Sequence, residues 1–277
     1  MDLDSLSADQ KCFHEAAKNN SVAKLKEMIN NLVNSKDELG KTPLQKVLFR
    51  DSSMNVTIET VAYLVKIGAD LNGKYCDGMT LLSQAIHEVG AIRIVKFLID
   101  YGANVNAKDD NDGYTPIHWA AKDGNVEIAK LLIASGAKID VKDNDGDTPL
   151  HEAAYSVQLD IVKLLIDSGA TIDIKNNKDM TPLHIAASQN EYKVVKCLVE
   201  NGAQIDPKDK ENRTPHFLAA KYDCCHVVNY LTKVKKRKAE NEPREIFDSK
   251  DPCVLCLEPR NEFYVLLPCG AWAYFTV

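Results

Sequence analysis

Apolar residues recur in the central part of the chain with the spacing of one face of an α-helix. Three such groups start 33 residues apart: Ile128, Leu131 and Leu132, then Ile161, Leu164 and Leu165, then Val194, Val195 and Leu198. Each group is followed by a Gly-Ala pair: Gly136-Ala137, Gly169-Ala170 and Gly202-Ala203. Because glycine readily adopts the left-handed conformation that ends a helix, the pattern predicts one helix per period, ending at this pair.

A Thr-Pro motif predicts a second helix in each period. The four copies are Thr115-Pro116-Ile117-His118, Thr148-Pro149-Leu150-His151, Thr181-Pro182-Leu183-His184 and Thr214-Pro215-His216-Phe217. Threonine is a good N-cap, and proline suits the first helical position, where its missing N–H costs nothing. An Ala-Ala pair follows each motif and lets a neighbouring helix approach closely: residues 120–121, 153–154, 186–187 and 219–220. Polar turns such as residues 143–147 separate one helix pair from the next.

A 33-residue period carrying this motif resembles the ankyrin repeat. The resemblance implies an all-α solenoid of helix-turn-helix repeats whose β-turns project as fingers. It also implies that the motif histidines, His118, His151 and His184, hydrogen-bond toward a neighbouring repeat.

The same plan continues upstream with irregular spacing. Further units open at Thr42 and Thr80, and the longer steps in this part predict insertions, the larger one at Arg50 to Val56. Terminal repeats are expected to be atypical because one face meets water. We assign residues 1–37 to a degenerate N-terminal repeat, 38–236 to about six further repeats, 237–250 to a charged linker and 251–277 to a separate tail.

The tail resembles the first half of a RING finger, the zinc domain of a class of ubiquitin ligases that also carry ankyrin repeats. Cys253, Cys256 and Cys269 match its first metal ligands, but Ala271 stands at the expected histidine and no further cysteine follows. Structural zinc takes four N or S ligands, so the RING is incomplete and no cofactor is expected; zinc would bind only if a longer product completed the domain. Without zinc, we expect residues 250–277 to be weakly ordered or to dock on the last repeat.

Composition limits the remaining function classes. A net charge of −6 argues against general nucleic-acid binding, and no run of 18 apolar residues suggests a membrane span. The acidic N-terminus lacks the features of a signal peptide, so we expect a cytoplasmic protein. Lys235, Lys236, Arg237 and Lys238 form either a nuclear localisation signal or the solvated last turn of a helix. Neither a phosphate loop nor a nucleophile–base spacing is present, so we expect neither an enzyme nor a small-molecule substrate.

The function is therefore expected in a surface, and the resemblance implies the concave face of the repeat array. The expected partner-binding residues are Lys41, Met79, Tyr114, Asp147, Met180 and Arg213 on the fingers, with Trp119 and Glu152 on first helices. Tyr114, Trp119 and Met180 are large apolar side chains that we expect to be partly open, unless Trp119 packs on the next repeat. The hypothesis is a groove centred on Tyr114, Asp147 and Met180, bordered by acidic turns such as residues 109–112, for a protein of basic or mixed charge.

These observations predict a monomeric adaptor or scaffold that binds a protein partner. Two alternatives remain at this point. One is the substrate-recognition arm of a RING-type ubiquitin ligase. The other is an inhibitor that occupies a transcription factor or kinase.

Overall fold

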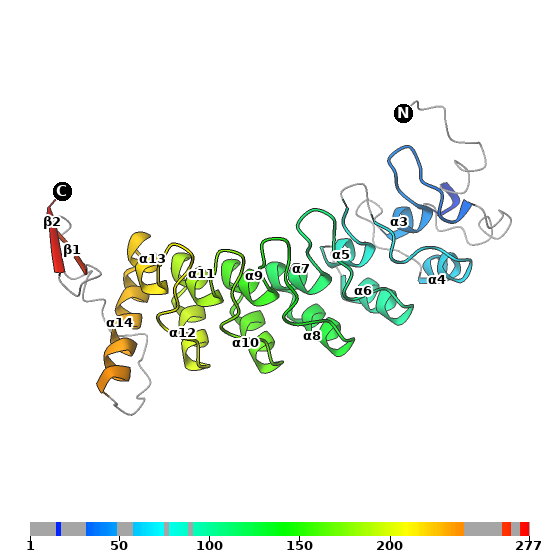
Figure 1. Cartoon of the computed structure of the whole chain (residues 1–277). Coiled ribbons are helices and arrows are strands. Elements are labelled where there is room, and N and C mark those ends of the chain that lie inside the picture. Colours follow the sequence, from blue (N-terminus) through cyan, green and yellow to red (C-terminus); the bar gives the residue numbers. More distant parts are fainter. Residues whose placement is uncertain are drawn as a thin grey trace. The chain divides into compact units, whose positions relative to one another are not determined.

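The computed structural model describes residues 15–17, 32–48, 58–74, 78–87, 91–240, 262–266 and 272–276. The chain divides into two compact units, residues 1–144 and 145–277. Figure 1 labels the helices and strands of both. Among the described helices, none combines the length and apolarity needed to cross a membrane.

The first unit consists of helix pairs. Its labelled helices are α3 (Pro43–Leu48), α4 (Ile58–Lys66), α5 (Leu81–Ile86), α6 (Ala91–Asp100), α7 (Pro116–Asp123) and α8 (Val126–Ala134). Each odd-numbered helix packs against the even-numbered helix that follows it. In addition, α5 packs on α7 and α6 on α8, so the first and second helices of successive pairs form two rows.

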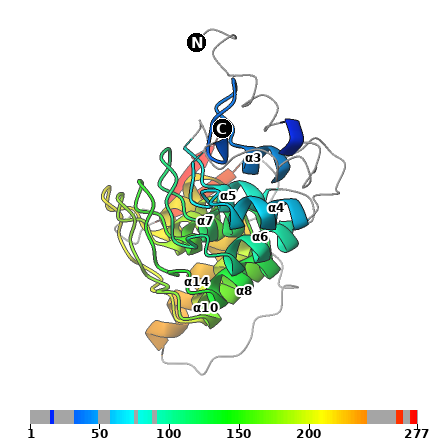
Figure 2. The same ribbon diagram turned by 90° about the vertical axis from the view of Figure 1, so that its right-hand side faces the viewer.

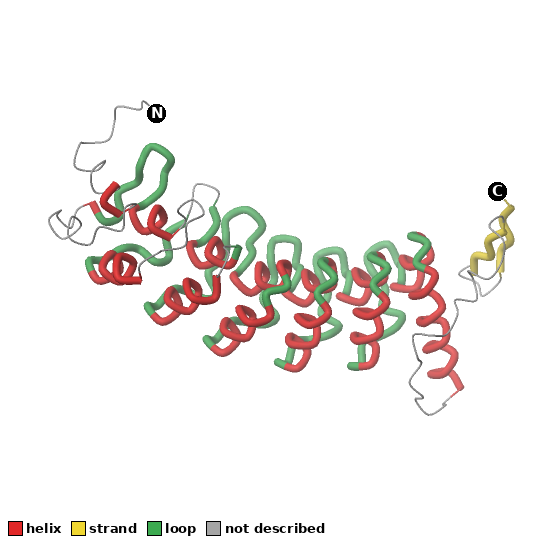
Figure 3. The backbone as a smooth tube through the Cα atoms, turned by 180° about the vertical axis from the view of Figure 1, so that it is seen from behind, coloured by secondary structure: helices red, strands yellow, loops and turns green. Residues whose placement is uncertain are grey.

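The second unit repeats this arrangement. Its helices are α9 (Pro149–Tyr155), α10 (Leu159–Asp167), α11 (Pro182–Ser188), α12 (Tyr192–Glu200), α13 (Pro215–Lys221) and α14 (Cys225–Glu240). α11 packs between α9 and α13, and α12 between α10 and α14 (Figure 3). The loops between successive pairs extend beyond the helices on one side, as fingers (Figure 2). The predicted helix-turn-helix repeats are therefore confirmed in the described part of the chain.

The helices begin and end where the sequence predicts. Thr148 and Thr181 are N-caps with extended backbone, each followed by proline in the first turn. At the other end of the pairs, Gly169 has a φ of 92° and a Cβ there would meet nothing within 4 Å. Glycine is needed at this position for its backbone conformation alone.

A glycine in the finger has a second role. Gly146 also has a positive φ, 79°, but a Cβ there would lie 2.7 Å from the backbone N of Asn177 in the next finger. That N–H donates to the carbonyl oxygen of Asp145 at 2.9 Å. The missing side chain therefore lets successive fingers hydrogen-bond backbone to backbone.

One residue of the second unit adopts the left-handed backbone conformation although its side chain is β-branched. Val157, between α9 and α10, has a φ of 65° and is 41% exposed. The equivalent positions of neighbouring repeats hold residues that tolerate positive φ better: Gly124, Asn190 and Asp223. A β-branched side chain in this region is a conformational outlier.

Replacing Val157 by glycine is expected to raise the free energy of unfolding by about 1 kcal/mol, because it relieves this strain and removes little buried surface. Urea unfolding followed by circular dichroism measures the change. Asn190→Gly is the matched control and should be nearly neutral, since asparagine already tolerates this conformation. A destabilised Val157→Gly protein would contradict the interpretation.

The two ends of the chain are described less completely. Of the degenerate first repeat only residues 15–17 and the segment from residue 32 are described, and Arg50–Val56, the expected insertion, lies outside the described residues. The ends of α3 and α4 flank that segment, consistent with a long connection there. In the tail, β1 (Glu262–Leu266) and β2 (Trp272–Thr276) pair antiparallel, with Tyr264 opposite Tyr274. These two strands depart from the expected all-α class.

Candidate partner-binding surface

A polar side chain closes each finger of the second unit. The Oδ1 atom of Asn176 accepts from the backbone N–H groups of Lys178 and Met180, both at 2.9 Å. Asp209 repeats this 33 residues later, and its Oδ1 accepts from Glu211 at 2.9 Å and from Arg213 at 2.8 Å. These turns are closed by side-chain acceptors that replace missing backbone partners.

Met180 and Arg213, which each precede a Thr-Pro motif, have their backbones held from both sides. The N–H of Met180 donates to Asn176, and its carbonyl oxygen lies 3.1 Å from His151 Nε2 of the preceding repeat. The N–H of Arg213 donates to Asp209, and its carbonyl oxygen lies 3.1 Å from His184 Nε2. The hydrogen bonds implied for His151 and His184 toward a neighbouring repeat are thereby confirmed. Met180 and Arg213 are thus presented on a rigid backbone.

The expected binding residues of the second unit differ in how accessible they are. Met180 is half-buried. The guanidinium of Arg213 is held by Asp209 and Glu211, at 2.7 Å in both ion pairs. Asp147 is half-buried and accepts a hydrogen bond from Asn176 Nδ2 at 2.7 Å. Met180 is therefore the least engaged side chain of this group.

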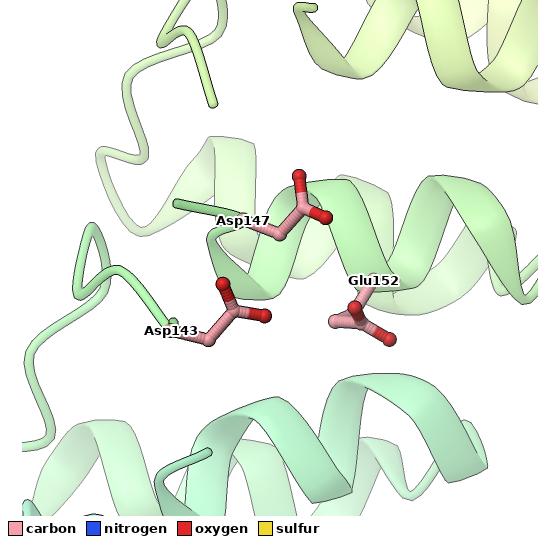
Figure 4. Close-up of side chains that lie close together, drawn as sticks. All are labelled: Asp143, Asp147 and Glu152. Carbon is pink, nitrogen blue, oxygen red and sulfur yellow. The ribbon is translucent and has the colours of Figure 1, made fainter. Parts of the chain in front are cut away.

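Glu152 does not form the exposed first-helix face that we expected. It is only 7% exposed. Its carboxylate and that of Asp147 have oxygens within 4.8 Å of each other (Figure 4), because the residue before an N-cap and the fourth helical residue face each other across the first turn. Asp143, also drawn in Figure 4, precedes the division of the chain at Asn144. We assign no metal ion to this group of carboxylates.

In the first unit the expectation for Tyr114 is wrong. Its side chain is 8% exposed, with the ring stacked on His118 and its centroid 4.9 Å from that of Trp119. Lys122 Nζ lies 5.2 Å from the same ring centroid. The physical reason is a hydrophobic staple: Tyr114 precedes the N-cap Thr115, and Trp119 is the fourth helical residue.

Trp119 is the more open member of this pair. It is half-buried, and its Nε1 donates to Asp109 Oδ2 at 3.2 Å. The ring of His87 meets it edge-on, with centroids 4.8 Å apart. Within the first unit, Trp119 thus offers the accessible aromatic surface that we had assigned to Tyr114. The other finger residues, Lys41 and Met79, are half-buried.

The hydrogen bonds of His184, a motif histidine of the second unit, require its neutral form. His184 Nδ1 lies 3.0 Å from the backbone N–H of Thr181 and accepts from it, so the ring proton is on Nε2 and is donated to Arg213. Burial holds the pKa of His184 below its ordinary value of 6.5. Burial and the nearby Lys235 do the same to the pKa of His216. Protonation would cost His184 its Nδ1 acceptor.

The free energy of unfolding is therefore expected to fall as the pH decreases from about 6.5. In this range the unfolded chain binds protons at His184 and His216, whose pKa values are lower in the folded protein. A separate loss of stability is expected below about pH 4, where Asp209 becomes protonated. Burial raises the pKa of Asp209, but the hydrogen bonds from Arg213 and Glu211 outweigh it, so the pKa lies below 3.8. Urea unfolding as a function of pH measures both windows. His184→Gln should reduce the slope in the upper window.

A family model described as ankyrin repeats (3 copies) matches residues 13–109, 108–176 and 159–242. These segments together span most of the chain. The chain belongs to the ankyrin repeat family. The implied solenoid repeats are thus those of the family, whereas the RING-like tail lies beyond the matched residues.

Relatives of this ankyrin protein match it over part of their length. An ankyrin repeat protein of Fowlpox virus (strain NVSL) is 36% identical over 100 residues, which cover 35% of this chain and 63% of that protein. Protein phosphatase 1 regulatory subunit 27 of Mus musculus is 35% identical over 95 residues, covering 34% of this chain and 60% of that protein. Neurogenic locus notch homolog protein 1 of Xenopus tropicalis is 33% identical over 112 residues, covering 40% of this chain and 4% of that protein. The chain therefore spans less than two thirds of each.

The candidate metal ligands Cys253, Cys256 and Cys269 lie outside the described residues of the ankyrin protein. What sequence reasoning missed are the finger-closing side chains. Asn176 and Asp209 stand five residues before Thr181 and Thr214, and Asp37 stands five before Thr42. This regular position was a visible signal that could have identified them.

Proposed function

We propose that this ankyrin protein is an adaptor that binds a protein partner through its fingers and first helices. The observation that carries the proposal is the double fixing of the backbone at Met180 and Arg213. A side chain presented on a rigid backbone loses little conformational freedom on binding, so more of its contact energy remains as affinity. Family membership supports binding rather than catalysis, and the mouse relative is named as a regulatory subunit.

Each unit contributes its own candidate surface. In the second unit it consists of Met180 with Asp147 and Arg213, and in the first unit of Trp119 with Lys41 and Met79. Tyr114 and Glu152 are buried and act through their neighbours, because Tyr114 contacts Trp119 and Glu152 lies next to Asp147. Finger charges of both signs favour a partner of mixed or basic charge, with the ankyrin protein itself as a monomer.

Replacing Met180 by alanine is expected to weaken partner binding by about 1–2 kcal/mol, or about 5- to 30-fold, as for an anchor residue of an interface. Affinity capture from a cell lysate with quantification of the bound proteins measures the loss. Trp119→Ala tests the first unit in the same way, and circular dichroism checks that both variants fold.

Tyr155→Ala is the matched control for this experiment. Tyr155 is 57% exposed and lies at the end of α9 away from the finger. This variant should retain every partner of the parent protein. Undiminished capture by both Met180→Ala and Trp119→Ala proteins would contradict the proposed surfaces.

The alternative function, the substrate arm of a RING-type ubiquitin ligase, gains no support from the comparisons. The family match ends at residue 242, before Cys253. It therefore stays an interpretation of the cysteine spacing alone.

For location we propose the cytoplasm, with entry into the nucleus through the basic run as the alternative. Lys235, Lys236, Arg237 and Lys238 lie in the last turns of α14, where their charges suit the negative end of the helix. Lys235 pairs with Asp206 at 3.0 Å. These contacts support the structural role of the run.

A further inference from the structure

The last repeat exposes apolar residues at positions that the other repeats of the second unit bury. His184, Ala187 and Val195 are completely buried in the repeat before it. Their equivalents 33 residues later are Phe217, Ala220 and Val228, of which Phe217 is 47% exposed, Ala220 is exposed and Val228 is half-buried. We call these three residues the C-terminal face.

This face is unusual for the end of a repeat array. Terminal repeats normally carry polar residues on the side that has no following repeat, because that side meets water. Here Phe217 replaces the motif histidine with a larger apolar ring. At the third helical position, where His151 and His184 complete the caps of α9 and α11, α13 has Phe217. Its cap is limited to Thr214 Oγ1, which accepts from the Phe217 N–H at 3.2 Å. The face therefore has the chemistry of a covered surface.

The chain supplies a segment that needs such a surface. The strands β1 and β2 have the sequences EFYVL and WAYFT, so five of their ten residues are aromatic. Successive positions of a strand alternate between its two faces, and both sets of alternate positions here include aromatic residues. An isolated two-stranded hairpin is at best marginally stable in water. At least one side of this pair gains stability from an apolar surface.

The chain between α13 and the strand pair is long enough for the pair to reach the C-terminal face. α14 has 16 residues, about 24 Å at 1.5 Å per residue. Residues 241–261 follow it and can reach up to about 70 Å when extended. The strand pair can thus return along α14 to α13. Because it is tethered to the same chain, its effective concentration at the face exceeds that of a free partner.

We propose that the β1–β2 pair docks on the C-terminal face and covers Phe217, Ala220 and Val228 in place of a further repeat. This contact closes the apolar end of the array. It is independent of the partner-binding surfaces proposed above, since it lies on the last helix pair, α13 and α14, and includes none of the residues named for those surfaces.

The test uses the full chain with Trp119→Phe, which leaves Trp272 of β2 as the single tryptophan. Docking through the strand face that carries Trp272, Tyr264 and Tyr274 is expected to shield Trp272 from acrylamide quenching. Phe217→Ser and Ala220→Lys should each raise the quenching toward that of free tryptophan. Both positions are exposed on α13, and lysine is a good helix former, so the repeats should fold as before. Tyr155→Ser, exposed elsewhere in the second unit, should leave the quenching unchanged.

Three results would overturn the proposal. Trp272 could be fully quenched in the parent protein, which would mean that the strand pair is undocked. Shielding could persist in both face variants, which would place it on another surface. Shielding that disappears on dilution would mean that the strand pair docks on a second copy of the chain, and analytical ultracentrifugation of the same samples would then show the dimer.

Discussion

Replacing His184 by alanine is expected to lower the free energy of unfolding by about 3 kcal/mol. The side chain is completely buried and uses both ring nitrogens. Without it, the N–H of Thr181 loses its acceptor at Nδ1, and the carbonyl of Arg213 loses its donor at Nε2. A buried polar group left without a partner costs about 1–3 kcal/mol, and the cavity left by the ring adds to this.

Urea unfolding at about pH 7.5 measures this loss, where the histidine is neutral in both states. His226→Ala is the matched control, because it removes the same side chain from an exposed position on α14 and should cost less than about 0.5 kcal/mol. Since His184 connects two repeats, its loss should also broaden the transition by weakening their coupling. Equal stabilities of the two variants would show that the histidine bonds carry no net free energy.

Replacing Asp209 by alanine is expected to cost a similar amount, about 3 kcal/mol. Its carboxylate accepts from two backbone N–H groups, those of Glu211 and Arg213, and pairs with Arg213 Nε at 2.7 Å. The Asp209 side chain is completely buried, so its removal leaves these donors without an acceptor inside the finger. The turn that presents Arg213 should then lose its fixed conformation.

Two further variants separate the contributions at this position. Asp209→Asn keeps an oxygen acceptor for the backbone and removes the charge, so it should cost about half as much; Asn176 already fills this role one repeat earlier. Asp206→Ala removes the exposed pair with Lys235 and should cost at most about 1 kcal/mol. Thermal and urea unfolding rank the three proteins. A cost for Asp206→Ala equal to that of Asp209→Ala would contradict the account of a buried finger cap.

The repeat period and the helix caps could be predicted because they depend on residues close in the chain. Thr181 caps the helix that starts at Pro182, and Gly202 follows the helix that it ends. A cap or a turn is a local hydrogen-bonding pattern, so three or four residues are enough to specify it. Repetition at one spacing then indicated how the helices stack.

The accessibility of the candidate site was harder to predict. Tyr114 and Met180 both stand directly before an N-cap threonine, yet Tyr114 is buried and Met180 is half-buried. The difference arises from neighbouring side chains, because Trp119 and Lys122 close over the tyrosine ring. The N′–N4 pairing rule could have identified the Tyr114–Trp119 contact, but not the position of Lys122.

The sequence by itself determined the repeat unit, the family resemblance and the ends of the helices, because all of these reside in local patterns that recur every 33 residues. Only the tertiary structure decided which finger residues are accessible, which arginine is already paired, and that Phe217, Ala220 and Val228 face outward. These properties depend on what a neighbouring repeat covers, and that contact joins residues about 30 positions apart in the chain.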